Sequence, residues 1–338
     1  MIDKREILEA TSSFSLGLPS VVEKDYVLGW ILAGINAHED VADSWVFKGG
    51  TCLKKCYFET YRFSEDLDFT LRDESHLDEG FLRPVFEEVI AWVSEQSGLI
   101  IPADQLDFDI YDNPRARPNC QAKIGYRGPV SPTTGGWPKI KLDLTADERL
   151  VLPPVRREVF HPYSDRPEGG IWANCYAYEE AFGEKLRALG ERTRPRDLYD
   201  VVNLYRHTDS RPAATAILDV LRQKCEYRAI PVPTFASILP HREALDSMWS
   251  DMLSHQLPVL RPLNDFWDAL PEIFAWLTTG APVPQPAILY PGTSEVAVRT
   301  RAARGRSIPP PLDAGDHPLC CGQPPVRRPL LRGQRATD

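Results

Sequence analysis

The chain has 338 residues, 43% of them hydrophobic and 26% charged, a length and composition that suit a globular protein of about two domains. Its 39 basic and 48 acidic side chains give a net charge of −9, which argues against a surface that binds nucleic acid or anionic membrane all over. A local basic groove remains compatible with this balance.

No apolar run approaches the roughly 18 to 20 residues that a membrane helix needs, and the N-terminal segment lacks the apolar core of a secretory signal. We therefore expect a cytoplasmic protein without membrane contact. The seven cysteines include no CxxC pair, so we expect neither a structural zinc site nor a disulfide framework, and interpret most of them as small core residues.

The first half of the chain alternates between helical and strand patterns. Helical periodicity over residues 4–38 predicts an amphipathic helix, and residues 45–50 predict a strand that ends in a glycine turn. Helical spacing resumes at residue 51, strict alternation follows over 63–71, and another helix is predicted over 77–97. Three further strands are expected at 106–111, 120–128 and 138–145, as a meander at one edge of the sheet.

The pattern of the second half predicts helices up to residue 279. Helices are predicted over 178–192, 196–207, 211–226, 241–254 and 263–278. Residues 280–338 hold 11 prolines, 6 glycines and 8 arginines without a sustained apolar period, and this composition predicts a basic, disordered tail. We expect an α+β domain with a mixed sheet over 1–176, a helical bundle over 177–279, and the tail.

Two carboxylates are predicted to project side by side from the strand at 63–71. Successive side chains of a strand point to opposite faces, so Asp66 and Asp68 share one face. Their separation would be about 6 to 7 Å, a span across which two acids can hold one divalent cation or bridge two. An exposed acidic strand face is the alternative, because DxD also occurs by chance.

A glycine turn, Lys48-Gly49-Gly50-Thr51, precedes that strand. Glycines let the backbone approach a phosphate, and a helix N-terminus directs N–H groups toward it. The segment matches neither the Walker loop nor GxGxxG, and alone it fits a plain turn. Together, the turn and the DxD strand supply a phosphate cradle and a metal chelate, the minimum equipment for nucleotidyl transfer.

Two later segments extend the candidate site. In residues 139–145, alternation places Lys141 and Asp143 on one face, where Asp143 would be a third carboxylate for a two-metal site and Lys141 would neutralise phosphate charge; a cross-strand salt bridge is the alternative. In residues 177–205, Glu180, Arg187 and Glu191 are expected on a solvated helix face. Arg196, Asp197 and Asp200 cluster on one helix face, and Lys185, Arg196 and Asp197 flank the apolar seam and are better candidates for chemistry.

These motifs together resemble the AbiEii/AbiGii toxin family, a branch of the DNA polymerase β-type nucleotidyltransferases. The matching blocks are VEKDYVLGWIL (22–32), FKGGTCLKKCYFETYRFSEDLDFTL (47–71), KIKLD (139–143) and EKLRALGERTRPRDLYD (184–200). Members are typically toxins of bacterial type IV toxin–antitoxin pairs, so the resemblance implies a cognate antitoxin. It departs mildly at Cys52 and Cys56, where small or polar residues are common.

The resemblance implies a role for each motif residue. Asp66, Asp68 and Asp143 would hold the metal and, with Lys141 and Lys185, form the catalytic set. The nucleotide-binding residues would be Lys48, Gly49, Gly50, Thr51, Arg62, Ser64, Arg196, Asp197 and Asp200. The Thr51 hydroxyl would contact phosphate, and Lys185 and Arg196 would neutralise developing charge.

We therefore expect an enzyme that transfers a nucleoside monophosphate from an NTP to an RNA, such as a tRNA 3′ end. The NTP would be GTP or a pyrimidine NTP, and the metal cofactor would be Mg²⁺ or alternatively Mn²⁺. Two alternatives remain: a nucleotide-binding module without transfer activity, which sequesters GTP or a protein partner, and a transferase that acts on a protein or small-molecule hydroxyl. RNA contacts are expected from a local basic set, namely Lys48, Lys54, Lys55, Arg62, Lys139, Lys141, Lys185, Arg192, Arg194 and Arg196.

Overall fold

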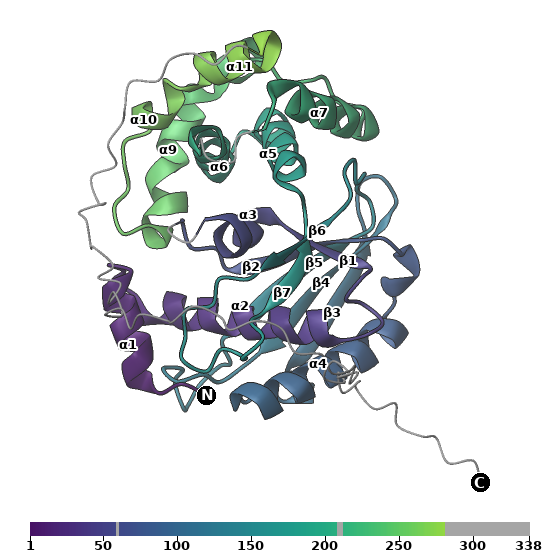
Figure 1. Cartoon of the computed structure of the whole chain (residues 1–338), viewed down its shortest axis with the longest axis vertical. Helices are drawn as coiled ribbons and strands as arrows, with labels where there is room; N and C mark the ends of the chain where they lie inside the picture. The colour runs from purple at the N-terminus through teal and green to yellow at the C-terminus, as the bar shows by residue number, and fades with distance from the viewer. Residues whose placement is uncertain (59–60, 208–211, 281–338) are drawn as a thin grey trace, which may run out of the picture. The chain divides into compact units, whose positions relative to one another are not determined.

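The computed structural model describes residues 1–58, 61–207 and 212–280. In this part of the chain, seven strands form one sheet in the order β3-β4-β5-β2-β1-β7-β6 (Figure 1). The β2–β5 and β1–β7 pairs are parallel and the other pairs antiparallel, so the sheet is mixed, as predicted. The strands are β1 (Trp45–Lys48), β2 (Asp66–Leu71), β3 (Leu106–Asp112), β4 (Pro118–Gly125), β5 (Lys139–Thr145), β6 (Val155–Glu158) and β7 (Trp172–Cys175).

The sheet confirms the predicted meander and adds two strands that the pattern did not predict. Strands β3, β4 and β5 are consecutive antiparallel neighbours, and β3 lies at one edge. Strands β6 and β7 have only four residues each, too few to establish an alternation, and β6 carries three charged residues. They extend the other edge because β7 pairs in parallel with β1.

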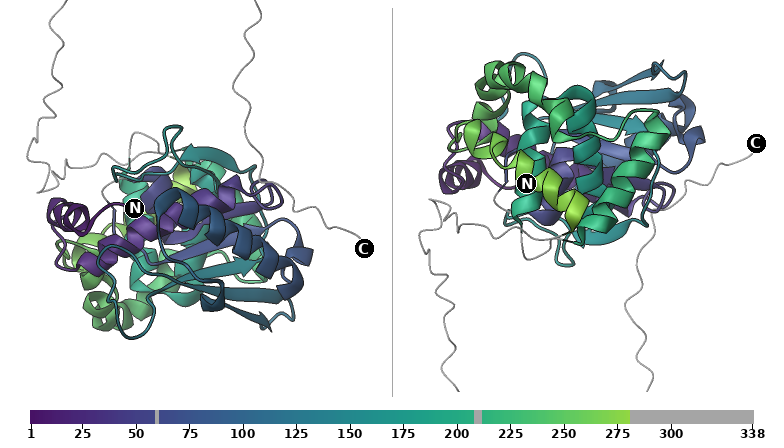
Figure 2. Two further views of the ribbon diagram at one scale, coloured as in Figure 1. Left: turned by 90° about the horizontal axis from the view of Figure 1, so that it is seen from below. Right: turned by 90° about the horizontal axis from the view of Figure 1, so that it is seen from above.

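Helices α2 (Pro19–Ala37) and α4 (Glu79–Ser97) cover one face of the sheet, and α1 (Lys4–Ser13) packs against α2 (Figure 2). The prediction of one helix over 4–38 was wrong, because α1 ends before Phe14 and Pro19 begins a new helix at its first turn. Helix α2 is not amphipathic either. It is buried almost continuously from Val22 to Ile35, since it packs against α1, α4 and the strands β5 and β7.

Helix α3 (Gly49–Cys52) continues directly into a π-helical turn (Leu53–Tyr57), and its two lysines point into the protein. Lys55 forms an ion pair with Asp25 at 3.1 Å, and Lys54 Nζ lies 4.1 Å from the ring centroid of Phe63. Both lysines are 1% exposed. The prediction that they contact RNA is therefore wrong.

The helices from residue 178 onward lie on the side of the sheet opposite α2 and α4 (Figure 1). They are α5 (Tyr178–Arg192), α6 (Pro195–Arg206), α7 (Ala214–Arg228), α8 (Phe235–Ile238), α9 (Arg242–Leu253), α10 (Asn264–Trp267) and α11 (Leu270–Thr279). The predicted helices are thus confirmed, except that α8 was missed and the last one is broken into α10 and α11. Short 3₁₀ turns occupy Glu74–His76, Ala103–Gln105, Leu239–His241 and Ser254–Gln256.

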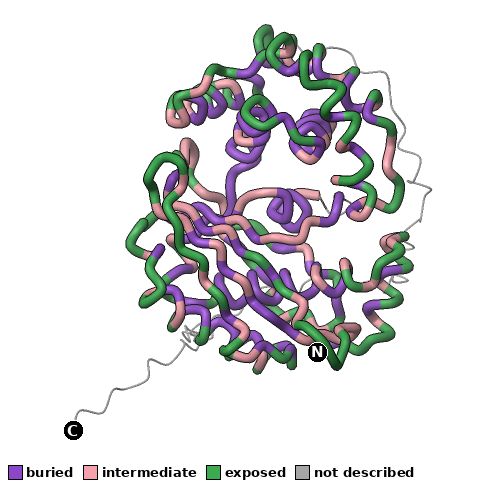
Figure 3. The backbone as a smooth tube through the Cα atoms, turned by 180° about the vertical axis from the view of Figure 1, so that it is seen from behind, coloured by how far each residue is buried: buried purple, intermediate pink, exposed green. Residues whose placement is uncertain are grey.

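Two hydrophobic cores support this arrangement (Figure 3). One lies between the sheet and α2 with α4, and includes Trp30, Phe47 and Phe86. The other lies among the later helices, around Phe182 and Trp276. The expected domain boundary at residues 176–177 falls between β7 and α5 and stays a prediction. The predicted tail lies outside the described residues apart from Gly280.

One predicted surface of α5 is buried instead. Helix α7 packs against α5, and its Lys224 Nζ lies 2.7 Å from a carboxylate oxygen of Glu180 and 3.5 Å from one of Glu184. Glu180 is 0% and Arg187 7% exposed, so the expectation of a solvated face is wrong for both and correct for Glu191. Charged groups are buried where an opposite charge meets them. For Glu180 that charge is Lys224 of the distant α7, and Arg187 pairs with Glu184 and Glu191 on α5 itself.

Within the three described ranges, none of the helices combines the length and the apolar composition that spanning a membrane requires.

Candidate active site

Strand β1 enters helix α3 through two glycines, and this turn lies directly against a carboxylate of β2. Gly49 has a φ of +80°, a left-handed conformation that glycine adopts without strain, and a Cβ at this position would overlap Oδ2 of Asp68. The Thr51 hydroxyl donates a hydrogen bond of 2.6 Å to the Asp66 carbonyl oxygen. The proton of this buried hydroxyl is therefore used within the fold, so Thr51 fixes the shape of the turn.

The segment before β2 packs beneath the same turn. A Cβ on Gly50 would lie 2.5 Å from Nη2 of Arg62 and 3.1 Å from Oγ of Ser64. Arg62 is 2% exposed, whereas Ser64 is half-buried. Both glycines are thus required by close approaches, one to a carboxylate and the other to a buried guanidinium.

The three candidate carboxylates lie in register on adjacent parallel strands. In the β2–β5 pair, Asp68 is opposite Asp143 and Asp66 is opposite Lys141. Strand β1 flanks β2 on its other side, with Lys48 opposite Asp68. Since paired strands lie about 4.8 Å apart, the register brings three carboxylates and a lysine to one region of the sheet.

The electrostatics reflect this crowding. Burial raises the pKa of Asp68 to about 6, the nearby charges of Asp143 and Asp66 add to the increase, and the cations Lys48 and Lys185 oppose it. The pKa of Asp66 is also raised, chiefly by burial. Like charges held together in a partly desolvated site create a demand for a cation.

Lys185 on α5 is held between this carboxylate cluster and a buried pair of acids on α6. Its Nζ lies 2.7 Å from Asp200 and 3.6 Å from Asp197. Asp200 also receives both Nε and Nη2 of Arg62 at 2.8 Å, and the Tyr61 hydroxyl at 2.7 Å. Both acids are fully buried. They therefore orient Lys185 and Arg62 and present no surface of their own to a ligand.

Three further basic candidates differ in exposure and in whether they pair with a carboxylate. Lys141 is exposed, and Arg196 is half-buried with Nε at 3.4 Å from the Met252 carbonyl oxygen. Arg192 binds Asp197 through Nε and Nη2 at 2.7 and 2.8 Å. Within the described part of the chain, Arg192 is hydrogen-bonded to a carboxylate, whereas Lys141 and Arg196 are not.

A second layer of charge, which sequence reasoning missed, supports Lys48. Lys48 Nζ lies 3.1 Å from Glu148, just beyond the end of β5, and Glu148 is also 3.9 Å from Lys224 on α7. One turn later on α7, Arg228 pairs with Asp147 at 3.3 Å. No local signal links these residues, because α7 reaches the end of β5 only in the folded chain.

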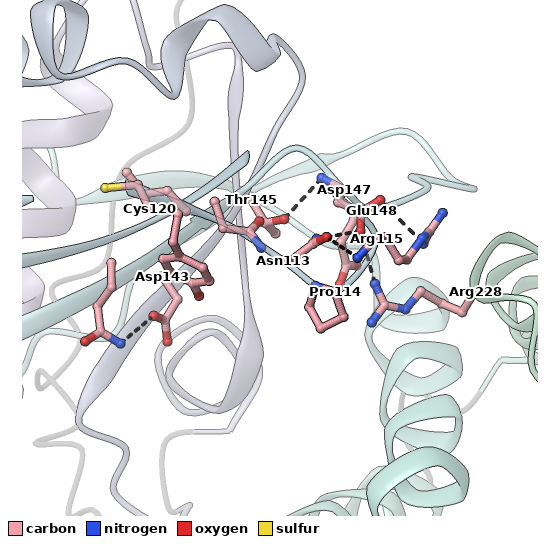
Figure 4. A pocket seen from close by; sticks show the side chains of 13 residues that line it. Asn113, Pro114, Arg115, Cys120, Asp143, Thr145, Asp147, Glu148 and Arg228 are labelled. Carbon is pink, nitrogen blue, oxygen red and sulfur yellow. Dashed lines mark hydrogen bonds and ion pairs between the residues drawn. The ribbon is translucent and has the colours of Figure 1, made fainter. Parts of the chain in front are cut away.

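A pocket of about 450 Å³ opens beside Asp143 and is lined by residues of β3, β4, β5 and the segment after β5 (Figure 4). Asp143 lies at one end, and Arg115 and Arg228 lie at the other. The Gln121 amide donates to Asp143 Oδ1 at 3.2 Å, and Oδ1 of Asn119 is buried without a hydrogen-bond partner. Gln121 faces Asp143 across β4 and β5, a pairing that only the folded sheet shows, and sequence reasoning did not predict this pocket.

Comparisons with known proteins show the family to which the chain belongs. The family model described as nucleotidyl transferase AbiEii toxin, type IV TA system, matches residues 30–272. Among solved structures, the chain is similar to MenT4, a nucleotidyltransferase toxin from Mycobacterium tuberculosis H37Rv, at 18% identity and a TM-score of 0.49 over 80% of this chain and 89% of that one. No curated protein matches. The family match spans most of the chain, and the protein therefore belongs to the AbiEii family of nucleotidyltransferase toxins of type IV toxin–antitoxin systems.

Proposed function

We propose that the protein transfers a nucleoside monophosphate from an NTP to a terminal hydroxyl of an RNA, with a tRNA 3′ end as the favoured acceptor. The observation that carries this proposal is the register of Asp68 with Asp143 across β2 and β5, directly beside the Gly49 turn. It places acids for a two-cation site next to a backbone that can approach phosphate.

The carboxylates fit divalent cations, for which we propose Mg²⁺ with Mn²⁺ as an alternative. Asp66, Asp68 and Asp143 would hold them, and oxygen ligands suit both cations. Among the described residues, the only set of three potential ligand atoms within 4.8 Å of one another consists of cysteines, so the carboxylates are spread more widely than that. Two-cation sites hold their ions about 3.5 to 4 Å apart, and the proposal assigns these three acids to such a pair of cations. Bound there, they supply charge stabilisation to the reacting phosphate.

Groups of the chain at different positions along the sheet would bind the phosphates, offset the developing charge and orient the acceptor. The amides of the Gly49–Gly50 turn and the Lys48 ammonium would bind the outer phosphates at β1. Lys185, oriented by Asp200 at 2.7 Å, and Arg196 would offset the negative charge that develops as pyrophosphate leaves. Asp143 on β5 would accept a hydrogen bond from the acceptor hydroxyl and orient its oxygen. A bond then forms between that oxygen and the α-phosphorus, the bond to the β-phosphate oxygen breaks, and the hydroxyl proton passes to solvent.

The position of the acceptor follows from in-line displacement. The attacking oxygen must approach the α-phosphorus from the side opposite pyrophosphate. With the outer phosphates at β1 and the acids at β2 and β5, the acceptor enters from β4, where the pocket beside Asp143 lies. Its Tyr111 ring can stack on a base, and Arg115 and Arg228 can contact backbone phosphate.

Labelled NTPs incubated with total RNA, purified tRNA and protein fractions test the proposal. We expect label in tRNA with one preferred NTP, GTP or a pyrimidine NTP, and its loss in Asp66→Asn. Asp107→Asn is the matched control, because Asp107 is an exposed strand carboxylate that pairs with Lys123 at 3.5 Å away from the site. Label that resists RNase and appears in protein would refute the RNA acceptor. Binding of NTP without any transfer would refute the reaction.

The pocket has its own test. Tyr111→Ala should raise the KM for RNA at least several-fold while the Kd for NTP stays unchanged. An equal loss of affinity for both substrates would contradict the assignment of this pocket to the acceptor. Family membership also implies an antitoxin, and we propose that coexpression of the cognate antitoxin restores growth to cells that express this chain.

A further inference from the structure

Three cysteines from separate parts of the sequence meet in the core beside the glycine turn. Cys52 lies on α3, Cys56 on the π-helical turn that follows, and Cys175 at the end of β7. All three are buried and free, and their sulfur atoms lie within 4.8 Å of one another. The other two described cysteines, Cys120 and Cys225, are buried elsewhere. Three of the five described thiols thus converge on one point.

The geometry is close to that of a thiolate metal site. A zinc–sulfur distance of about 2.3 Å in a tetrahedral site places the ligand sulfurs about 3.8 Å apart. Sulfur atoms that already lie within 4.8 Å need to approach by at most about 1 Å. Cys52 and Cys56 are four residues apart on consecutive helical turns, which places them on one side of the helix, and Cys175 faces them from β7.

The surroundings can balance the charge of such a site. Three thiolates and one divalent cation carry a net charge of −1, which is costly to bury alone. Arg157 supplies a positive charge that acts on Cys175 and Cys56, and its Nε donates to the Cys56 carbonyl oxygen at 2.7 Å. The Arg157 guanidinium also lies 4.3 Å from the ring centroid of Tyr57, which keeps it close to the cluster.

We propose that Cys52, Cys56 and Cys175 bind one zinc ion, with a fourth coordination position left for a small ligand such as water. The sequence-based expectation against zinc rested on local spacing, and spacing does not reveal ligands that only the fold brings together. The site is separate from the carboxylates and does not depend on the proposed reaction.

Zinc at this position would stabilise the turn that the transferase uses. Cys52 follows Thr51 directly in α3, and Cys175 is the residue of β7 that pairs with Phe47 of β1. The ion would therefore join β7 to the helix that starts at Gly49. Because metal bound to the folded state adds its binding free energy to folding, chelation should lower the melting temperature.

Cobalt titration of the full-length chain tests the proposal. The adjacent thiols Cys320 and Cys321 are replaced by serine throughout, so that they do not contribute sulfur ligands. Under anaerobic reducing conditions we expect one Co²⁺ per chain with a sulfur-to-cobalt charge-transfer band, displaced by Zn²⁺, and a higher melting temperature with zinc. Carboxylate-bound cobalt gives no such band, so binding at Asp66 and Asp68 is not mistaken for it.

The variants Cys52→Ser and Cys175→Ser should each weaken cobalt binding at least ten-fold and lose most of the band, whereas Cys120→Ser and Cys225→Ser should match the parent. A parent protein without the band overturns the proposal regardless of how the variants fold. An unchanged band in Cys175→Ser, or a stable disulfide within the cluster in metal-free purified protein, overturns it as well.

Discussion

The loss of Asp200 should damage the structure strongly, because it is a buried anion that satisfies two buried cations. It accepts two hydrogen bonds from Arg62 at 2.8 Å, lies 2.7 Å from Lys185 Nζ, and is 0% exposed. Asp200→Ala leaves both cations without their main partner. Breaking a buried pair from one side costs about 3 to 5 kcal/mol. At roughly 2 °C per kcal/mol for a chain of this size, the melting temperature should fall by about 6 to 10 °C.

Thermal and urea unfolding followed by circular dichroism measure this loss. Glu9→Gln removes one member of the exposed Arg5–Glu9 pair and serves as a control, expected to change stability by no more than about 0.5 kcal/mol. The double variant Arg62→Met/Asp200→Leu should be more stable than Asp200→Ala, because it leaves one fewer unpaired buried charge. A melting temperature for Asp200→Ala within about 2 °C of the parent would refute the reasoning.

The same residue predicts how stability depends on pH. Arg62 and Lys185 hold the pKa of Asp200 well below its usual range despite burial. A lowered folded-state pKa contributes stability above the unfolded value of about 4 and loses it as the pH falls further. The difference between the parent and Asp200→Ala should therefore shrink in acid.

Three further predictions concern the site and its support. Gly49→Ala should lower the free energy of unfolding by about 1 to 2 kcal/mol, because alanine must adopt the left-handed backbone conformation of Gly49. It should also abolish transfer, because its Cβ overlaps Asp68. A fully active variant would contradict the account of the turn. Because the pKa of Asp68 is about 6 and its protonated form is neutral and no longer attracts a cation, calorimetry should record weaker Mg²⁺ binding as the pH falls from 7.5 to 5.5. A pH-independent affinity would refute the assignment. Lys224→Met leaves Glu180, Glu184 and Glu148 without their shared cation and should lower the free energy of unfolding by about 3 to 5 kcal/mol. The control Lys123→Met breaks a half-exposed pair and should lower it by no more than about 1 kcal/mol. Equal effects in denaturant titrations would count against the buried network.

The sequence predicted what depends on local periodicity. The alternation around Asp66 and Asp68, the glycine turn, the β3–β5 meander and most of the later helices follow from patterns within one segment. The break between α1 and α2 was missed although Pro19 marks it. Because apolar residues recur at helical spacing both before and after Pro19, the pattern looks like one helix and does not show where α2 begins.

What could not be predicted depends on partners far away in the chain. Glu180 and Arg187 resemble a solvated helix face, yet Lys224 of α7 pairs with Glu180, and Arg187 is buried with its partners Glu184 and Glu191 on α5. Lys54 and Lys55 resemble surface cations in the sequence, yet in the core Lys54 lies against the Phe63 ring and Lys55 pairs with Asp25. The meeting of Cys52, Cys56 and Cys175 has the same origin, because β7 was too short to be predicted as a strand.

The most direct test of the central claim compares α-labelled with γ-labelled NTP as the donor to tRNA, using the parent and Asp68→Asn. The proposed reaction predicts that label from the α-phosphate becomes attached to the tRNA 3′ end, that label from the γ-phosphate is released in pyrophosphate, and that Asp68→Asn transfers neither. Attachment of γ-label, or equal transfer by Asp68→Asn, would contradict it.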